Sequence, residues 1–239
     1  MVLEYVGANY AGWQYQINAL SIQEVVETAL GKMLAMESRV TASGRTDAGV
    51  HAIYQPASVD VNTRMTDAEI LKGLNSLLPK DIVVKELETA PPGFSVIRSA
   101  KEKTYRYTIL NSPIRSAMDH GRVWWIINPL DLEAMTEGAK ALLGEHDFTS
   151  FRSASCTAGN PVRSLKRLEI KAEGAKLYLE FTANGFLKQM VRNLVGTLVF
   201  VGLGKIKAVG VAEILEAKDR RMAGPCAPPE GLCLMDVVY

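Results

Sequence analysis

The sequence has few of the residues that build disulfide frameworks and metal sites. Among its 239 residues are three cysteines and three histidines. Cys156, Cys226 and Cys233 show no CxxC spacing, and the histidines lie too far apart in sequence for an HxxxH-like pair. Such a set builds neither a disulfide framework nor a structural zinc site. We therefore expect a protein that uses no metal.

From the sequence we expect neither a membrane-spanning segment nor a secretion leader. The longest apolar run, 194–204, is too short to span a bilayer. The first ten residues include Glu4 and do not show the basic stretch followed by an apolar one that is typical of a signal peptide. We therefore expect a cytoplasmic protein with no membrane partner. Its length suits one large domain or two modest ones.

Positive and negative charges nearly balance over the whole chain, whose net charge is +1. The cations are nevertheless unevenly spread. Stretch 93–125 carries six Lys or Arg against two acids, stretch 150–172 carries five against one, and stretch 181–212 carries four and no acid. Stretches that converge would form a basic surface for a polyanion. Stretches that stay apart would be three ordinary solvated faces, and the sequence leaves both readings open.

The densest group of chemically active side chains lies in the loop 43–52. Gly44 and Gly49 flank it and permit tight backbone turns. Arg45 and Asp47 stand two residues apart, so in an extended segment they share one face. A charged loop between two predicted strands is where folds usually place a site, which makes Asp47 a candidate catalytic residue. The alternative is an aspartate that only accepts backbone hydrogen bonds in a turn.

The first part of the chain alternates strands and helices. Strands are predicted at 1–6, 39–42, 50–61 and 82–87. Helices are predicted after Ser21 and Thr66, because each is followed three residues later by a glutamate, as in a capping box. The resulting order, β-α-β-β-α-β, is that of the ferredoxin-like fold, which RNA-recognition modules share.

The second part repeats this mixture of elements. Strands are predicted at 104–110, 162–170, 177–182 and 233–239, and helices at 129–143, 186–203 and 209–217. We therefore predict an α/β (α+β) fold of two pseudo-duplicated, ferredoxin/RRM-like units, residues 1–97 and 98–239. Their mixed, mainly antiparallel sheets are expected to join, with helices on one side and an active-site cleft between the units.

Three residues in the second part are candidates for a functional site. Tyr105 and Tyr107 share one face of their predicted strand, where they either stack on a base or pack in the core. Arg192 lies within the apolar stripe of the longest predicted helix. An unpaired buried charge is very costly, so Arg192 needs a partner or an active-site cavity, and Asp47 is a candidate partner.

Six motifs follow one another in the chain. The most specific is Gly44-Arg45-Thr46-Asp47-Ala48-Gly49-Val50-His51-Ala52; the others are Tyr10-Ala11-Gly12-Trp13-Gln14, Lys103-Thr104-Tyr105-Arg106-Tyr107 and the segments 146–151, 185–193 and 227–232. In this order they resemble the TruA family of tRNA pseudouridine synthases. One departure is Val6, where the family usually has an aspartate before the glycine, and this change affects the expected tRNA contacts.

The resemblance implies an isomerase that converts uridine to pseudouridine at positions 38–40 of the tRNA anticodon stem-loop. It implies a homodimer that needs no cofactor. Asp47 matches the catalytic aspartate, Tyr105 the tyrosine that contacts the flipped-out base, Arg192 the arginine that supports the aspartate, and Arg45 an arginine that contacts RNA. Attack at C1′, addition at C6 and proton removal from C2′ all remain open for Asp47.

Two other classes of function fit parts of the sequence. One is a non-catalytic tRNA-binding or tRNA-folding module with Asp47 as a turn residue, although the aromatic string of RNA-recognition modules is absent. The weaker one is a hydrolase with Asp47 as nucleophile, which the missing metal cluster disfavours.

Overall fold

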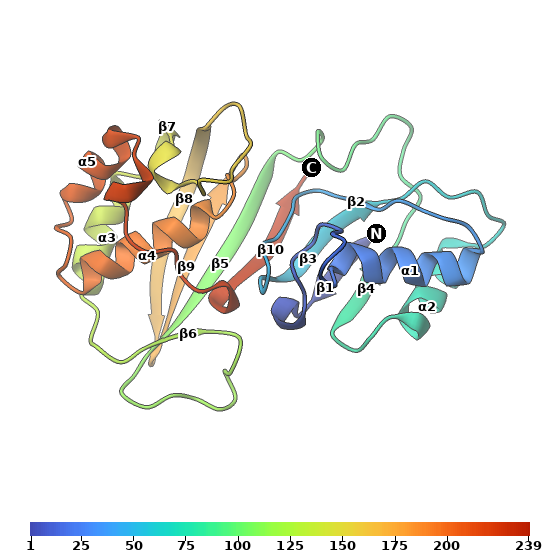
Figure 1. Cartoon of the computed structure of the whole chain (residues 1–239), viewed down its shortest axis with the longest axis horizontal. Coiled ribbons are helices and arrows are strands. Elements are labelled where there is room, and N and C mark those ends of the chain that lie inside the picture. Colours follow the sequence, from blue (N-terminus) through green and yellow to red (C-terminus); the bar gives the residue numbers. More distant parts are fainter. The chain divides into compact units, whose positions relative to one another are not determined.

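A computed structural model describes residues 1–239 as two compact units (Figure 1). Unit 1 comprises Met1–Lys101 and Cys233–Tyr239, and unit 2 comprises Glu102–Leu232. The predicted α/β class with mainly antiparallel strand pairing is confirmed. The division into domains at residue 97 stays a prediction, because compactness does not establish which segments fold alone.

The sheet of unit 1 is built around strand β3 (His51–Ser58). β1 (Val2–Tyr5) lies antiparallel between β3 and β4 (Ile82–Glu86). Two further strands pair with β3: β2 (Thr41–Ala42) is antiparallel and meets its C-terminal end, and β10 (Leu232–Val238) is parallel and meets its N-terminal end. The order β4-β1-β3-β2 is the one expected of a β-α-β-β-α-β unit. The last strand adds a parallel pairing that the sequence pattern did not indicate.

Two capped helices complete unit 1. α1 (Ile22–Leu34) begins where the Ser21 hydroxyl accepts the Glu24 backbone N–H at 3.2 Å. α2 (Asp67–Leu77) begins at a full capping box, because Thr66 accepts from Glu69 N and the Glu69 carboxylate accepts from Thr66 N at 2.8 Å. The predicted boxes are therefore complete at Thr66 and half formed at Ser21.

The tryptophan of the loop after β1 packs inward. Trp13 is 2% exposed, and its ring centroid lies 6.3 Å from that of Tyr5, which is equally buried. A ring removed from solvent in this way cannot stack on an RNA base. Trp13 is thus a core residue of unit 1, joined there by Leu3, Ile22 and Leu74.

The sheet of unit 2 has the antiparallel order β5-β9-β8-β7. These strands are β5 (Glu102–Asn111), β9 (Lys176–Ala183), β8 (Val162–Glu173) and β7 (Gly144–Asp147), and a short β6 (Trp124–Ile126) pairs parallel with β5. β6 and β7 were not predicted. They have three and four residues and no alternating pattern, so backbone pairing with long neighbours is what makes them strands.

Three helices gather beside this sheet: α3 (Leu132–Lys140), α4 (Met190–Gly202) and α5 (Gly210–Ala217) (Figure 1). Eleven of the thirteen α4 residues are buried, which explains its apolar sequence. α4 starts at Met190 rather than at 186, because Gln189 adopts the left-handed conformation with φ of 60° and residues before it form a separate turn. No helix of the structure combines the length and apolarity needed to cross a bilayer.

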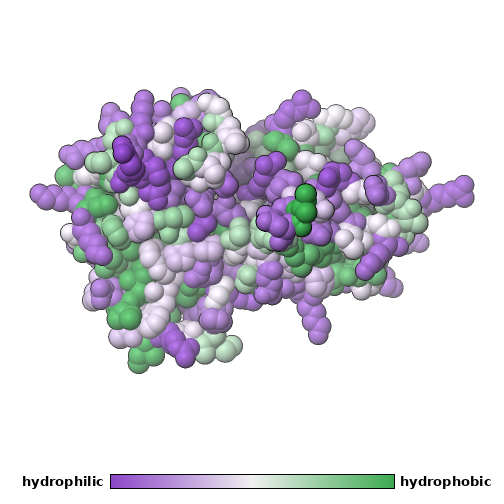
Figure 2. All heavy atoms as spheres, viewed as in Figure 1, coloured by the Kyte–Doolittle hydropathy of each residue, from purple (hydrophilic) through white to green (hydrophobic).

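The surface drawn in Figure 2 is mainly hydrophilic, and hydrophobic residues form small, separate patches on it. Scattered exposed apolar residues are normal for folded proteins and need no functional explanation.

We expect Thr66→Ala to lower the free energy of unfolding by about 1 kcal/mol, because it removes an N-cap. The control is Thr136→Ala on the exposed face of α3, whose hydroxyl donates to Leu132 O, four residues earlier. Such a bond adds nothing to helix stability. Urea unfolding followed by circular dichroism should show a lower midpoint for Thr66→Ala alone, and equal losses would contradict the capping assignment.

Candidate active site

The Asp47 loop of unit 1 is attached by its backbone to the loop that follows β1. Trp13 N donates to Thr46 O at 3.1 Å, and Gly49 N donates to Tyr10 O at 3.2 Å. These bonds lie on either side of Asp47. Backbone hydrogen bonds do not depend on side-chain rotamers, so they fix the main chain that carries the aspartate.

Two glycines make this attachment sterically feasible. A Cβ on Gly12 would lie 2.6 Å from Thr46 O, and a Cβ on Gly7 would lie 2.0 Å from Val50 O. Gly12 also has a φ of +89°, a conformation that side chains disfavour. The sequence analysis named residues 10–14 only as a motif of the family resemblance. The structure shows what the glycines of this N-terminal segment do, since they leave room for the Asp47 loop.

The neighbours of Asp47 have distinct environments. Thr46 is buried, and its hydroxyl lies 2.8 Å from the Tyr5 hydroxyl, whereas Arg45 is exposed and Asp47 is half-buried. The turn predicted as an alternative is present. It is closed by Val50 N, which donates to the backbone oxygen of Asp47 at 3.1 Å. Since the main chain closes this turn, a turn role alone does not require the Asp47 carboxylate.

In unit 2, the two tyrosines of β5 have different surroundings. Tyr105 is 7% exposed, and its ring meets Phe186 edge-on at 5.2 Å between centroids. Tyr107 is fully buried, and its hydroxyl donates to Pro228 O at 2.7 Å. Burial raises the pKa of Tyr107, so its hydroxyl stays protonated. Tyr107 therefore fits the packing role and leaves Tyr105 as the candidate for substrate contact.

Lys103 lies on the same face of β5, two residues before Tyr105. The sequence analysis counted its stretch among the exposed basic segments, but Lys103 is half-buried. Burial also lowers the pKa of its ammonium group. Nothing in the sequence distinguished it from the nearby, exposed Lys101, because only the packing around each side chain separates the two.

Arg192 is held by the C-terminal motif of the family. It lies in the first turn of α4 and is half-buried. Its Nε donates to Ala227 O at 2.8 Å, and Ala227 N donates back to Arg192 O at 3.1 Å. A Cβ on Gly196 would lie only 1.7 Å from Pro225 O. This glycine therefore lets the segment that holds Arg192 lie directly on α4.

A buried network fixes α4 immediately after Arg192. Asn193 is fully buried; its Nδ2 donates to Phe151 O at 2.8 Å, and its Oδ1 accepts from Arg220 at 2.9 Å. A buried amide with both ends bonded specifies one orientation of its helix. The sequence analysis did not single out Asn193 or Arg220, because their separation in the chain gives no local signal.

The predicted site residues fall in both units. Asp47 and Arg45 belong to unit 1, and Tyr105 and Arg192 belong to unit 2. The pairing of Asp47 with Arg192 stays a prediction. No group of three or more His, Cys, Asp or Glu side chains in the structure stands close enough together to hold a metal ion.

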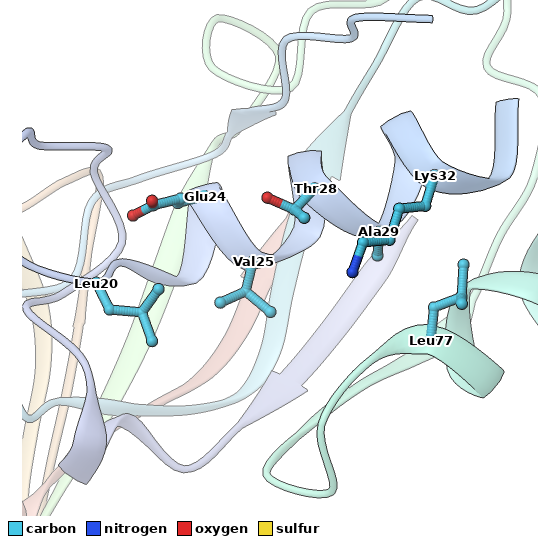
Figure 3. A pocket seen from close by; sticks show the side chains of 7 residues that line it. All are labelled: Leu20, Glu24, Val25, Thr28, Ala29, Lys32 and Leu77. Carbon is cyan, nitrogen blue, oxygen red and sulfur yellow. The ribbon is translucent and has the colours of Figure 1, made fainter. Parts of the chain in front are cut away.

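A shallow depression of unit 1 lies elsewhere, with a volume of about 200 Å³ (Figure 3). It is lined by Leu20, Glu24, Val25, Thr28, Ala29, Lys32 and Leu77. Figure 3 shows that most of these side chains stand along one side of α1, with Leu77 approaching from α2. None of the predicted site residues lines this depression, and its two charged residues have opposite signs.

Proteins with similar sequences identify the family. The chain is 46% identical to tRNA pseudouridine synthase A of Geobacter sulfurreducens over 100% of this chain and 98% of the relative. It is 44% identical to the protein of the same name from Methylococcus capsulatus, over 99% of this chain and 88% of the relative. A chain in a crystal structure of a Cbf5-Nop10-Gar1 complex matches 98% of this chain and 57% of its own length, at 12% identity. Its TM-score is 0.38, and no conclusion is based on this likeness.

These relatives place the chain among the isomerases that act on tRNA. It belongs to the tRNA pseudouridine synthase family, whose sequence pattern matches residues 1–97 and 139–239. The predicted activity, isomerisation of uridine in tRNA, is therefore confirmed at the level of the family.

We expect Gly12→Ala to lower the rate of pseudouridine formation by about a hundredfold, because displacing a reacting group by about 1 Å has effects of that size. Gly93→Ala is the matched control. Its φ is +80°, but nothing lies within 4 Å of the added Cβ, so it should lose only about 1–2 kcal/mol of stability to backbone strain.

The rates are measured by tritium release from tRNA labelled at uridine C5, alongside thermal unfolding of each variant. A Gly12→Ala protein with wild-type turnover would contradict the role assigned to this glycine.

Proposed function

We propose that this enzyme isomerises uridine to pseudouridine at positions 38–40 of the tRNA anticodon stem-loop, with Asp47 as its catalytic carboxylate. The observation that carries the proposal is the attachment of the Asp47 loop. Its backbone is hydrogen-bonded on both sides of a half-buried aspartate, and preorganisation of this kind is what a reacting group requires.

The chemistry needs a carboxylate and a freed base. The N1–C1′ bond breaks, the uracil turns, and a C5–C1′ bond forms; the C5 proton is lost and N1 ends protonated, so atoms and electrons balance without a co-reactant. A carboxylate can attack C1′, add to C6 or remove the C2′ proton. Each route begins from ionised Asp47, and the proposal does not depend on which one is followed.

Three other residues have supporting roles in this proposal. Tyr105 contacts the flipped-out uracil, and the edge-on contact with Phe186 sets the plane of its ring. Arg192 matches the arginine to which the family resemblance assigns the support of the catalytic aspartate. Arg45, exposed two residues before Asp47, contacts the RNA as its strand enters the site.

The target uridine must leave its stack to reach Asp47. Flipping a nucleotide costs a few kcal/mol, and contacts between phosphates and cations can offset that cost.

We expect Asp47→Asn to bind tRNA but to form no pseudouridine, because the amide keeps the shape of the side chain and removes its charge. The control is Asp60→Asn, an exposed aspartate outside the loop, which should retain full activity. An unmodified transcript with uridines at 38, 39 and 40 is incubated with each protein, and pseudouridine is mapped by carbodiimide-dependent stops of reverse transcription.

Each result has a clear meaning. Stops at 38–40 that disappear only with Asp47→Asn support both the position and the residue. Stops elsewhere in the tRNA would overturn the position. Turnover by Asp47→Asn would overturn the catalytic assignment, and tight tRNA binding without any stops would favour the non-catalytic RNA-binding module.

The proposal also includes a homodimer in the cytoplasm, as the family resemblance implies. Light scattering after size-exclusion chromatography tests the first part, since the mass of one chain is 26.1 kDa. A measured mass equal to that of one chain, at the protein concentration of the activity assay, would overturn the proposed homodimer.

A further inference from the structure

A loop and a turn of unit 2, which meet through their backbones, carry three cations. The loop 152–160 approaches the turn 184–189, where Ser153 N donates to Lys188 O at 2.9 Å. The Lys188 ammonium group donates to the Ser155 hydroxyl at 2.9 Å. Arg152 precedes this contact, and Arg163 follows the loop. Arg152, Arg163 and Lys188 are called the cation cluster below.

Arg163 is the most rigid member of the cluster. Its Nη1 donates to Asn160 O at 2.9 Å and to Val162 O at 2.6 Å. Its Nε lies 3.7 Å from where a Cβ on Gly185 would be, so the guanidinium lies against the turn. Nε and Nη2 donate no hydrogen bond to the protein. A half-buried guanidinium with free donors in a fixed position is suited to binding an oxyanion.

The cation cluster has no acidic counterpart. Stretches 148–168 and 181–212, which supply it, contain no Asp or Glu, and none of its members forms an ion pair. Other cations of unit 2 are neutralised: Arg106, Arg167 and Lys176 each pair with a carboxylate. The serine hydroxyls beside Lys188 are also groups that commonly bind phosphate.

The cluster is joined to the candidate substrate tyrosine by the same turn. Phe186, which meets the Tyr105 ring, is two residues before Lys188, and these two residues span at most about 7 Å. An anion bound at the cluster therefore lies close to a base held at Tyr105. A tRNA strand carries one phosphate per nucleotide, so its own backbone supplies anions at that place.

We propose that the cation cluster binds backbone phosphates of the tRNA strand at and beside the flipped-out uridine, and so positions that nucleotide for isomerisation. The inference rests on the proposed function, since Tyr105 marks the target base. Sequence reasoning already makes Arg152 and Lys188 candidates for phosphate contact; the structure adds Arg163 and the backbone contact between the loop 152–160 and the turn 184–189.

The test is the salt dependence of tRNA binding. We expect Lys188→Gln to weaken binding about tenfold and to reduce the slope of log K against log salt by about 0.7–0.9. Lys188→Arg should restore most of both. Lys140→Gln is the control with the same change in net charge, because Lys140 is exposed on α3 and paired with Glu137. Filter binding between about 50 and 200 mM KCl measures the slopes.

A second measurement locates the contact on the RNA. A set of synthetic tRNAs is made, in each of which a single linkage around positions 38–40 is replaced by an uncharged methylphosphonate. At the contacted linkage, the substitution should weaken binding to the wild type about tenfold and to Lys188→Gln very little, because the partner is already missing. Elsewhere both proteins should lose equally.

Either of two results would overturn the inference. One is a Lys188→Gln slope equal to that of the wild type or of Lys140→Gln. The other is an equal loss for both proteins at every linkage. Neither result affects the mapping of pseudouridine by the wild type, so failure of this inference is distinguishable from failure of the proposed function.

Discussion

The backbone contact between the loop after β1 and the Asp47 loop is the constraint on which unit 1 depends. Trp13 N and Tyr10 O bond to residues on either side of Asp47, and the bonds form because Gly12 leaves room for Thr46 O. Trp13 in turn anchors its own loop in the core. The aspartate is thus carried by a loop whose main chain is hydrogen-bonded to a neighbouring segment on both sides of it.

In unit 2, Arg192 is also held by a segment whose close backbone approach depends on a glycine. A glycine on α4 admits a carbonyl at a distance that no side chain tolerates, and the segment so placed bonds to the arginine through Ala227. Asn193, the next residue of the helix, is hydrogen-bonded into the buried core by its own side chain. In both units, close backbone approach rather than side-chain packing alone fixes the groups that the family resemblance marks as functional.

The cations of unit 2 are divided by their partners. On β5, β8 and β9 they pair with carboxylates, which balances the charge across the strands. Around the loop 152–160 they have no carboxylate partner. A polyanionic substrate is attracted where protein charge is not already neutralised, so the distribution of ion pairs carries information that net charge does not.

Local pattern was enough for the regular elements. The N-caps at Ser21 and Thr66 fixed where α1 and α2 begin, and the Arg-Thr-Asp signature located the candidate carboxylate, because both signals lie within a few neighbouring residues. β6 and β7 escaped prediction, since strands of three and four residues exist only through their partners. The start of α4 was misplaced because a single left-handed residue, Gln189, is not encoded by periodicity.

The sequence by itself determined the family, the order of the strands and helices other than β6 and β7, and the identity of the candidate reacting groups. Only the tertiary structure decided what surrounds them: that Trp13 packs in the core, that Gly12 admits the Asp47 loop, and that Lys103 is half-buried beside the exposed Lys101. The physical reason is that burial and close approach are properties of residue pairs distant in the chain, and a linear pattern records only neighbours.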